Sequence, residues 1–313
     1  MAKLSKAYDV LVIGGGPAGL SAALALGRMK RTALVCDDGR PRNAPSSHAN
    51  NLPSQDGIHP GLWREKARAD LRKYKTIDFH DGAVHSVVSR DKHFLVELGS
   101  GESLVVRKVI LAHGIRDRLP AIEGLEALWG KAAFHCPYCH GFEIQGKKLG
   151  LIGNGKMAEH LIPMLATLSD DLMLLTQGPS ELDPEFRSRL DQHGIKVVEK
   201  TIATLDFTGE ELKAVRFEDG QRLEREALFI APTFPIAMKA DFGEKLGCEK
   251  TEMGHFKTVE TGKTTVAGVF AAGDIAVGPQ SVLGAASLGQ LAGAGAVHEL
   301  VHEDFKLGRA SKS

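Results

Sequence analysis

Two cysteines separated by two residues are the side chains best suited to chemistry in this sequence. Cys136 and Cys139 stand in the run 135–140, which reads His-Cys-Pro-Tyr-Cys-His. Cysteines at this spacing can close a small disulfide ring, and a thiol at the start of a helix is stabilised as its thiolate. His140 follows the second cysteine, and a neutral imidazole beside a thiol can accept its proton. We therefore expect thiol–disulfide chemistry with Cys136, Cys139 and His140 as the catalytic residues.

The run 135–140 is compatible with other kinds of site. A zinc site could use both cysteines with His135 and His140, but four ligands within six residues are too crowded for one tetrahedral chelate, and the chain has no second Cys-x-x-Cys. We predict no metal. A glutaredoxin-like module also carries Cys-Pro-Tyr-Cys, but that pair should follow the first strand of a small thioredoxin-type fold. Two buried cysteines without chemistry, and a helix-surface role for His140, remain the alternatives.

A glycine-rich turn near the start of the chain predicts a dinucleotide site. The apolar strand 9–13 runs into Gly14-x-Gly16-x-x-Gly19, a helical stretch follows, and the next strand ends at Asp37. In such a βαβ unit the glycines allow a tight turn and close approach of a pyrophosphate to the helix N-terminus, while the acidic residue accepts hydrogen bonds from a ribose. The expected cofactor contacts here are Gly14, Gly16, Pro17, Ala18, Gly19 and Asp37.

The same signature occurs a second time. Strand 148–152 leads into Gly153-x-Gly155-x-x-Ala158, which opens another helix. Gly153, Gly155 and Ala158 are therefore candidates for a second nucleotide site. The repeat predicts an α/β fold with two Rossmann-like, three-layer dinucleotide-binding domains.

A segment near the C-terminus indicates which dinucleotide binds first. The stretch 264–274, which ends in Ala-Ala-Gly273-Asp274, resembles the second flavin fingerprint of the pyridine-nucleotide–disulfide oxidoreductases. In that family the aspartate contacts the ribitol chain, so the resemblance implies FAD and gives this role to Asp274. The alternative is an aspartate that caps the helix expected to begin near Ser281. Together the two flavin motifs imply one FAD domain, residues 1–115 and 245–313, split by an inserted NAD(P)H-binding-like domain, residues 116–244, which carries the cysteines.

The order of motifs along nearly the whole chain resembles the low-molecular-weight thioredoxin reductases. The resemblance implies that Cys139 faces the flavin and Cys136 exchanges with substrate, that Asn51 lies near the flavin ring, and that Gln280 and Ser281 lie near its pyrimidine edge. It also implies a homodimer and a small-molecule dithiol or a thioredoxin-like protein as partner.

Two departures from that family direct the functional expectation. Typical thioredoxin reductases have an aspartate where this chain has His140, and the local run resembles the dithiol oxidases that close disulfides in natural products. NADPH users of the family carry His-Arg-Arg after the second strand of the nucleotide domain, where this chain has Thr176-Gln177-Gly178. NADPH binding is therefore in doubt.

We expect oxidation of a dithiol with oxygen as acceptor. The alternatives are a thioredoxin reductase that uses NADPH, ferredoxin or another donor, and a flavin-binding redox sensor.

Composition excludes other classes of partner. The 313 residues include 39 basic and 39 acidic side chains, and only 6% are aromatic, so no nucleic-acid surface is indicated. Alternating charges in 64–70 are typical of a solvated helix face. No apolar run approaches the ~20 residues that span a bilayer, and no signal peptide is recognisable, so we expect a cytoplasmic protein that does not bind membranes. Cys36 and Cys248 are expected to be packing residues.

Overall fold

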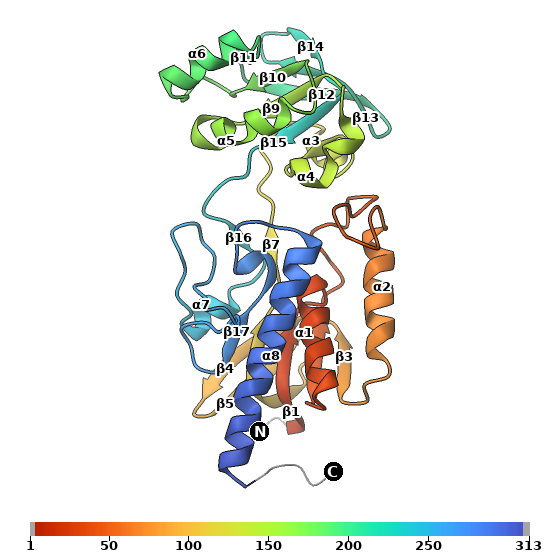
Figure 1. Ribbon diagram of the computed structural model, residues 1–313, viewed down its shortest axis with the longest axis vertical. Coiled ribbons are helices and arrows are strands. Elements are labelled where there is room, and N and C mark those ends of the chain that lie inside the picture. Colours follow the sequence, from red (N-terminus) through yellow and green to blue (C-terminus); the bar gives the residue numbers. More distant parts are fainter. Residues whose placement is uncertain (1–3, 309–313) are drawn as a thin grey trace. The chain divides into compact units, whose positions relative to one another are not determined.

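The computed structural model describes residues 4–308 and divides into two units (Figure 1). The first unit comprises Met1–Ala44, Pro60–Arg116 and Phe234–Ser313, and the second comprises Pro45–His59 and Asp117–Thr233. The extreme ends of the expected FAD domain, 1–3 and 309–313, lie outside the described residues. The two units are described separately.

The first unit is built on a sheet whose strands follow the order β3, β2, β1, β6, β5, β4, with β17 also paired to β6. The strands are β1 (Leu4–Ile13), β2 (Ala33–Asp37), β3 (Ile77–Asp81), β4 (Val84–Arg90), β5 (His93–Leu98), β6 (Ser103–Leu111) and β17 (Val269–Ala271). The sequence pattern predicts separate strands at 103–106 and 108–112, and the structure shows that this prediction is wrong. One strand spans both because its first part pairs antiparallel with β5 and its last three residues pair in parallel with β17.

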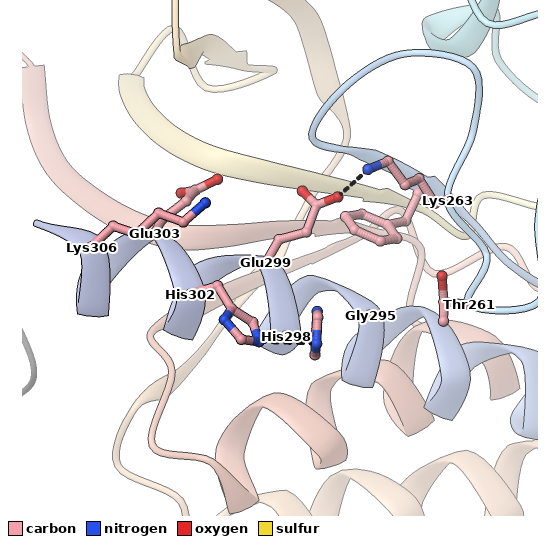
Figure 2. Close-up of a pocket in the computed structure, with 9 residues that line it drawn as sticks. Thr261, Lys263, Gly295, His298, Glu299, His302, Glu303 and Lys306 are labelled. Carbon is pink, nitrogen blue, oxygen red and sulfur yellow. Dashed lines mark hydrogen bonds and ion pairs between the residues drawn. The ribbon is translucent and has the colours of Figure 1, made fainter.

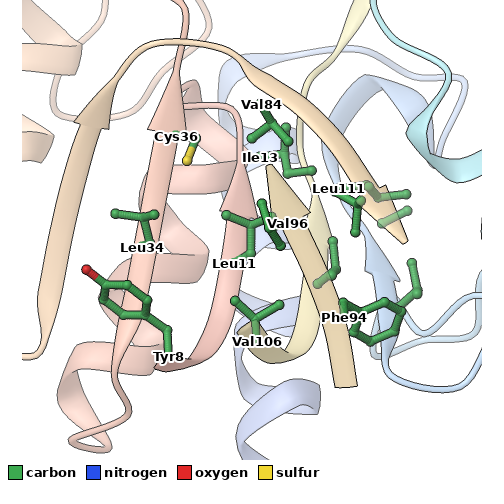
Figure 3. Close-up of a cluster of buried hydrophobic side chains, with 14 of the residues drawn as sticks. Tyr8, Leu11, Ile13, Leu34, Cys36, Val84, Phe94, Val96, Val106 and Leu111 are labelled. Carbon is green, nitrogen blue, oxygen red and sulfur yellow. The ribbon is translucent and has the colours of Figure 1, made fainter. Parts of the chain in front are cut away.

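Both faces of this sheet are covered, which explains the continuous apolar run in β1. Val10 and Val12 pack into a core shared with helices α1 (Pro17–Arg28) and α8 (Val282–Lys306). Leu11 and Ile13 point to the opposite face and pack with side chains of β4, β5 and β6 (Figure 3). Successive strand residues face opposite sides, so one strand supplies both cores.

Helix α8 lies directly against α1 because small residues let the two backbones approach. A Cβ atom on Gly289 would lie 1.9 Å from the carbonyl oxygen of Ala18. Helix α8 begins one residue after Ser281, whose hydroxyl accepts a hydrogen bond from the Gly284 amide at 2.9 Å. Ser281 therefore caps this helix, and Asp274 does not.

The first unit contains further elements beside this sheet. They are α2 (Pro60–Leu71), α7 (Phe242–Leu246) and the two-stranded sheet of β7 (Ile115–Arg116) with β16 (Ala237–Met238).

The second unit contains a five-stranded parallel sheet in the order β11, β10, β9, β15, β8. These strands are β8 (Ala133–Phe134), β9 (Leu149–Ile152), β10 (Leu172–Leu175), β11 (Lys196–Val198) and β15 (Ala227–Ile230). Helices α5 (Gly155–Leu165) and α6 (Pro184–Gln192) pack against one face. The other face packs against α3 (Leu125–Leu128) and an antiparallel sheet of β12 (Ile202–Thr208), β13 (Glu211–Phe217) and β14 (Arg222–Glu224). The predicted fold of two Rossmann-like, three-layer domains is confirmed.

Two segments pack elsewhere than the expected domain limits suggest. Residues 234–244 belong to the first unit, where β16 pairs with β7 and Phe242 packs on the core. Pro45–His59 belongs to the second unit, which also contains the cysteine pair. No helix within residues 4–308 is both long and apolar enough to cross a bilayer.

Candidate active site

The first glycine-rich turn leaves room for an anion at the start of α1. Gly14 directly follows β1 with φ of 114°, and Gly16 is the N-cap residue of α1. No side chain caps the first amides of α1, and a Cβ atom on Gly16 would meet nothing within 4 Å. Open space in front of unpaired helix amides is what a pyrophosphate needs. Pro17, Ala18 and Gly19 form the first turn of α1, so the predicted residues lie together and fit FAD.

Asp37 ends β2 as expected, and it has a partner that the sequence did not reveal. Its carboxylate forms an ion pair with the guanidinium of Arg64, whose Nε also donates to the carbonyl of Gly15 at 3.2 Å. The Arg64 side chain is only 17% exposed. The interpretation of 64–70 as a solvated helix face is therefore wrong for Arg64, because its side chain points from α2 toward the first glycine-rich turn.

The second flavin fingerprint forms another polar cluster in the same unit. Gly273 and Asp274 lie in the 3₁₀ turn η2 (Gly273–Ile275), directly after β17. The guanidinium of Arg42 donates to the Asp274 carboxylate at 3.0 Å and to Oε1 of Gln280 at 2.6 Å. Arg42 thus joins two predicted cofactor residues, although it is far from both in the sequence.

The second glycine-rich turn also leads from a strand into a helix, but it is capped by the protein itself. Asn154 is the N-cap residue of α5, and its Oδ1 accepts from the amides of Gly155 at 3.0 Å and Glu181 at 2.8 Å. Its Nδ2 donates to the carbonyl of Pro179 at 2.9 Å. Asn154 therefore ties the loop after β10 to the start of α5 and uses an amide that a bound phosphate would need.

An acidic side chain also faces this turn. A Cβ atom on Gly155 would lie 3.8 Å from a carboxylate oxygen of Glu181, where Gly16 has open space. A carboxylate at this point repels a pyrophosphate. Gly153, Gly155 and Ala158 lie together as expected, but their surroundings differ from those of the first turn.

The basic residues near this turn are already paired with acids. Arg187 lies 3.7 Å from Glu199, and Arg189 lies 3.9 Å from Glu185. In the loop after β10, the Gln177 side chain accepts a hydrogen bond from the Ile202 amide at 2.6 Å. None of these contacts replaces the missing His-Arg-Arg run.

The cysteine pair forms a disulfide at the short helix α4 (Pro137–His140) of the second unit. The Cys136 and Cys139 sulfur atoms are 2.17 Å apart, and Cys136 is the N-cap residue. Asn50 Nδ2 donates to the Cys139 carbonyl at 2.9 Å. The predicted Asn51 lies in the same segment with φ of 60°. Asn50 was missed because the family motif points to its neighbour.

His140 is held beside the disulfide by two contacts. Its Nε2 lies 2.8 Å from the Ser46 hydroxyl, and its ring stacks on Phe134 with centroids 4.3 Å apart. Burial, assisted by the nearby His48, lowers the pKa of His140 to about 4. The imidazole is therefore neutral at physiological pH, which is the state that can accept a proton.

The remaining candidates carry no such arrangement. Cys36 and Cys248 are buried free thiols, as expected of packing residues, and burial raises the pKa of Cys36 to about 12. Across residues 4–308, no three His, Cys, Asp or Glu side chains gather to hold a metal ion.

A pocket of about 420 Å³ along α8 contains none of the predicted site residues (Figure 2). On its walls Lys263 pairs with Glu299 at 2.6 Å, and the Nε2 atoms of His298 and His302 are 3.1 Å apart.

Known proteins share this architecture. Residues 8–289 match the family of the pyridine nucleotide-disulphide oxidoreductases. The thioredoxin reductase sirT of Leptosphaeria maculans is 36% identical over 97% of this chain and 98% of its own length. The crystal structure of HlmI superposes with a TM-score of 0.91 at 34% identity, covering 98% of this chain and 97% of HlmI. An oxidoreductase from Agrobacterium tumefaciens superposes with a TM-score of 0.88 at 36% identity, covering 95% and 99%.

The chain belongs to the pyridine nucleotide-disulphide oxidoreductase family. It is a flavoprotein oxidoreductase of the thioredoxin reductase-like type, which confirms the resemblance noted from its motifs. Membership implies a flavin cofactor, in agreement with the open turn at Gly16.

Proposed function

We propose that this flavoprotein oxidises a dithiol to a disulfide and that oxygen accepts the electrons. The observation that carries the proposal is the contrast between the two glycine-rich turns. The first is uncapped and open at Gly16, whereas in the second Asn154 caps the helix and the Glu181 carboxylate lies beside Gly155. A chain whose first glycine-rich turn can bind FAD, and whose second is capped and acidic, is suited to take electrons from a thiol substrate instead of NADPH.

The cysteines would act by thiol–disulfide exchange. A substrate thiolate attacks Cys136, the Cys136–Cys139 bond breaks, and Cys139 leaves as a thiolate. The second substrate thiol then attacks the mixed disulfide, closes the substrate disulfide and releases Cys136. Two electrons and two protons thereby move from the substrate to the pair.

His140 would accept a proton during this exchange, because burial keeps its imidazole neutral. FAD, when bound, supplies the two-electron acceptor that restores the disulfide and converts oxygen to hydrogen peroxide. The balanced reaction is dithiol plus oxygen to disulfide plus hydrogen peroxide.

The roles of the other residues follow from the same proposal. Gly14, Gly16, Pro17, Ala18, Gly19 and Asp37 would hold the adenosine diphosphate part of FAD, and Asn51, Gly273, Asp274, Gln280 and Ser281 would hold its flavin part. A cytoplasmic homodimer that accepts a small dithiol completes the proposal.

The alternative is a disulfide reductase for a thioredoxin-like protein. The relative sirT is named a thioredoxin reductase, and the segment Gly153–Ala158 keeps the strand-to-helix connection of a nucleotide-binding unit. This function requires that a nucleotide bind beside the Glu181 carboxylate and replace the Asn154 cap at the Gly155 amide.

Oxygen consumption distinguishes these functions. The purified flavoprotein is mixed with a small dithiol in air, and oxygen uptake, hydrogen peroxide and remaining thiols are measured. We expect one peroxide for each disulfide formed and loss of turnover in the Cys139→Ser variant. Turnover that requires NADPH and consumes no oxygen would establish the alternative.

A further inference from the structure

We infer that Ser46 is a positioning residue that fixes the tautomer of His140. It holds the proton of the neutral imidazole on Nε2 and leaves Nδ1 as the atom that accepts a proton. This inference rests on the proposed role of His140 and adds the atom that performs it.

The argument begins with the single proton of the Ser46 hydroxyl. Its Oγ lies 3.1 Å from the carbonyl oxygen of His48 and 2.8 Å from Nε2 of His140. A carbonyl oxygen can only accept, so the hydroxyl proton is directed to His48. Both contacts are hydrogen bonds only if Nε2 of His140 donates to Oγ. The neutral ring therefore carries its proton on Nε2.

The other ring nitrogen is then an unprotonated base. Nδ1 of His140 is shielded from solvent and has no hydrogen-bond partner among residues 4–308. A buried acceptor without a partner is costly, which makes such a group a candidate for function. The stack on Phe134 restricts rotation of the ring. The lone pair of Nδ1 is thus available for a proton released at the adjacent cysteine pair.

The position of Ser46 is itself well determined. Ser46 is only 8% exposed, and its segment folds back on itself through the Ala49–Ile58 bridge and the contact of His48 Nδ1 with the Gly57 carbonyl at 3.1 Å. A Cβ atom on Gly130 would lie 3.0 Å from the Ser46 amide nitrogen, so the glycine lets this backbone pack closely. The hydroxyl is therefore presented to His140 by a folded segment.

Nitrogen NMR of the oxidised flavoprotein tests this directly. Histidine labelled with ¹⁵N distinguishes the protonated from the unprotonated ring nitrogen, and the His140→Asn variant identifies the signals of His140. We expect a protonated Nε2 and an unprotonated Nδ1 at neutral pH. A protonated Nδ1 in the wild-type protein would overturn the inference, whatever the variants do.

Three variants separate positioning from general stabilisation of the helix turn. Ser46→Ala removes the acceptor for Nε2–H, and loss of one ordinary hydrogen bond should shift the tautomer ratio by about fivefold. Because the rate follows the fraction of His140 in the Nε2–H tautomer, the rate constant for anaerobic reduction of the protein by a dithiol should fall by less than about twofold, and Ser46→Thr should restore both quantities. The matched control is Asn50→Ala, which removes a hydrogen bond to the same turn without touching the imidazole.

The control decides between the interpretations. A shift of the tautomer ratio in Asn50→Ala equal to that in Ser46→Ala would contradict the role of Ser46, as would an unchanged ratio in Ser46→Ala. The NMR measurement needs no turnover. It therefore holds or fails independently of whether oxygen or a nucleotide is the redox partner.

Discussion

The pH dependence of the contribution made by His140 tests its role as a buried base. The perturbation is His140→Asn, measured beside the wild-type protein between pH 5 and pH 7.5. Both proteins react with the same dithiol, whose thiolate fraction falls with pH in the same way. The pH dependence of the substrate thiolate therefore cancels in the ratio of the two rate constants, and the ratio follows the fraction of His140 that is neutral.

The expected size of the effect follows from burial. The pKa of His140 is lowered from 6.5 to about 4, chiefly by desolvation and further by His48. At pH 5 such a group is still about 90% neutral, whereas a group with a pKa of 6.5 would be only about 3% neutral. The two cases differ roughly 30-fold in the active base. General base catalysis typically contributes at least ~100-fold, so the ratio is large enough to follow.

Stopped-flow absorbance under anaerobic conditions measures these rate constants. We expect the ratio of wild type to His140→Asn to stay within about twofold from pH 7.5 to pH 5. The control is His135→Asn, which removes the histidine stacked on Trp129 at the other end of the run and should react like the wild type. A ratio that declines with a midpoint near pH 6.5 would refute the reasoning, because the base would then be exposed to water.

Three further predictions concern stability and nucleotide binding. Burial lowers the pKa of His113 from 6.5 to about 4, so the folded protein binds this proton more weakly than the unfolded chain does. The free energy of unfolding is therefore highest above pH 6.5 and falls as the pH drops. Between pH 7 and pH 5, urea unfolding should show a decrease that is about 2 kcal/mol smaller in His113→Leu than in the wild type. Gly289→Val forces a side chain against the Ala18 backbone. Thermal or urea unfolding should show at least ~3 kcal/mol of destabilisation, together with release of the flavin. The control Gly278→Ala, where a Cβ atom meets open space, should change the free energy of unfolding by less than ~0.5 kcal/mol. Glu181→Gln removes an exposed negative charge beside the second glycine-rich turn. Two like charges about 4 Å apart in water repel each other by about 1 kcal/mol, so a fluorescence titration should show roughly fivefold tighter NADPH binding in this variant. An unchanged affinity would count against electrostatic exclusion of the nucleotide.

Much of the fold could be predicted because its signals are local. The turn at Gly14–Gly19 lies between a strand and a helix that adjoin it in sequence, and its glycine spacing has a direct steric cause. The same holds for Gly153–Ala158. The sequence also predicts one FAD domain formed by two separated parts of the chain, because its two fingerprints are separate local patterns. The sequence pattern divides β6 into two strands, whereas the structure has one strand that changes partners along its length. The partners of a strand are not a local property of its sequence.

The contacts that shape the site could not be predicted, because they join distant residues. Ser46 and His140 are 94 positions apart, and Arg42 and Asp274 are 232 apart. A single sequence does not specify which side chains meet across such distances. Arg64 was misjudged for a related reason, since the alternation of charges around it is typical of a solvated helix and only the packing of α2 reveals Asp37 as its partner.

The second glycine-rich turn combines a local pattern that the sequence predicts with contacts that it does not predict. Its glycines gave a correct local structure, and the absent arginines gave a reason for doubt. The hydrogen bonds of Asn154 and the position of the Glu181 carboxylate depend on how the loop after β10 folds back, which no short motif encodes.

The most direct test of the proposed function is an anaerobic titration of the purified flavoprotein, followed by the visible absorbance of its flavin. We predict that stoichiometric NADPH or NADH leaves the absorbance unchanged, that a dithiol bleaches it, and that admitted air restores it. Rapid bleaching by one equivalent of NADPH would show that a nucleotide reaches the second turn despite Asn154 and Glu181. That result would contradict the account and establish a nucleotide-dependent reductase.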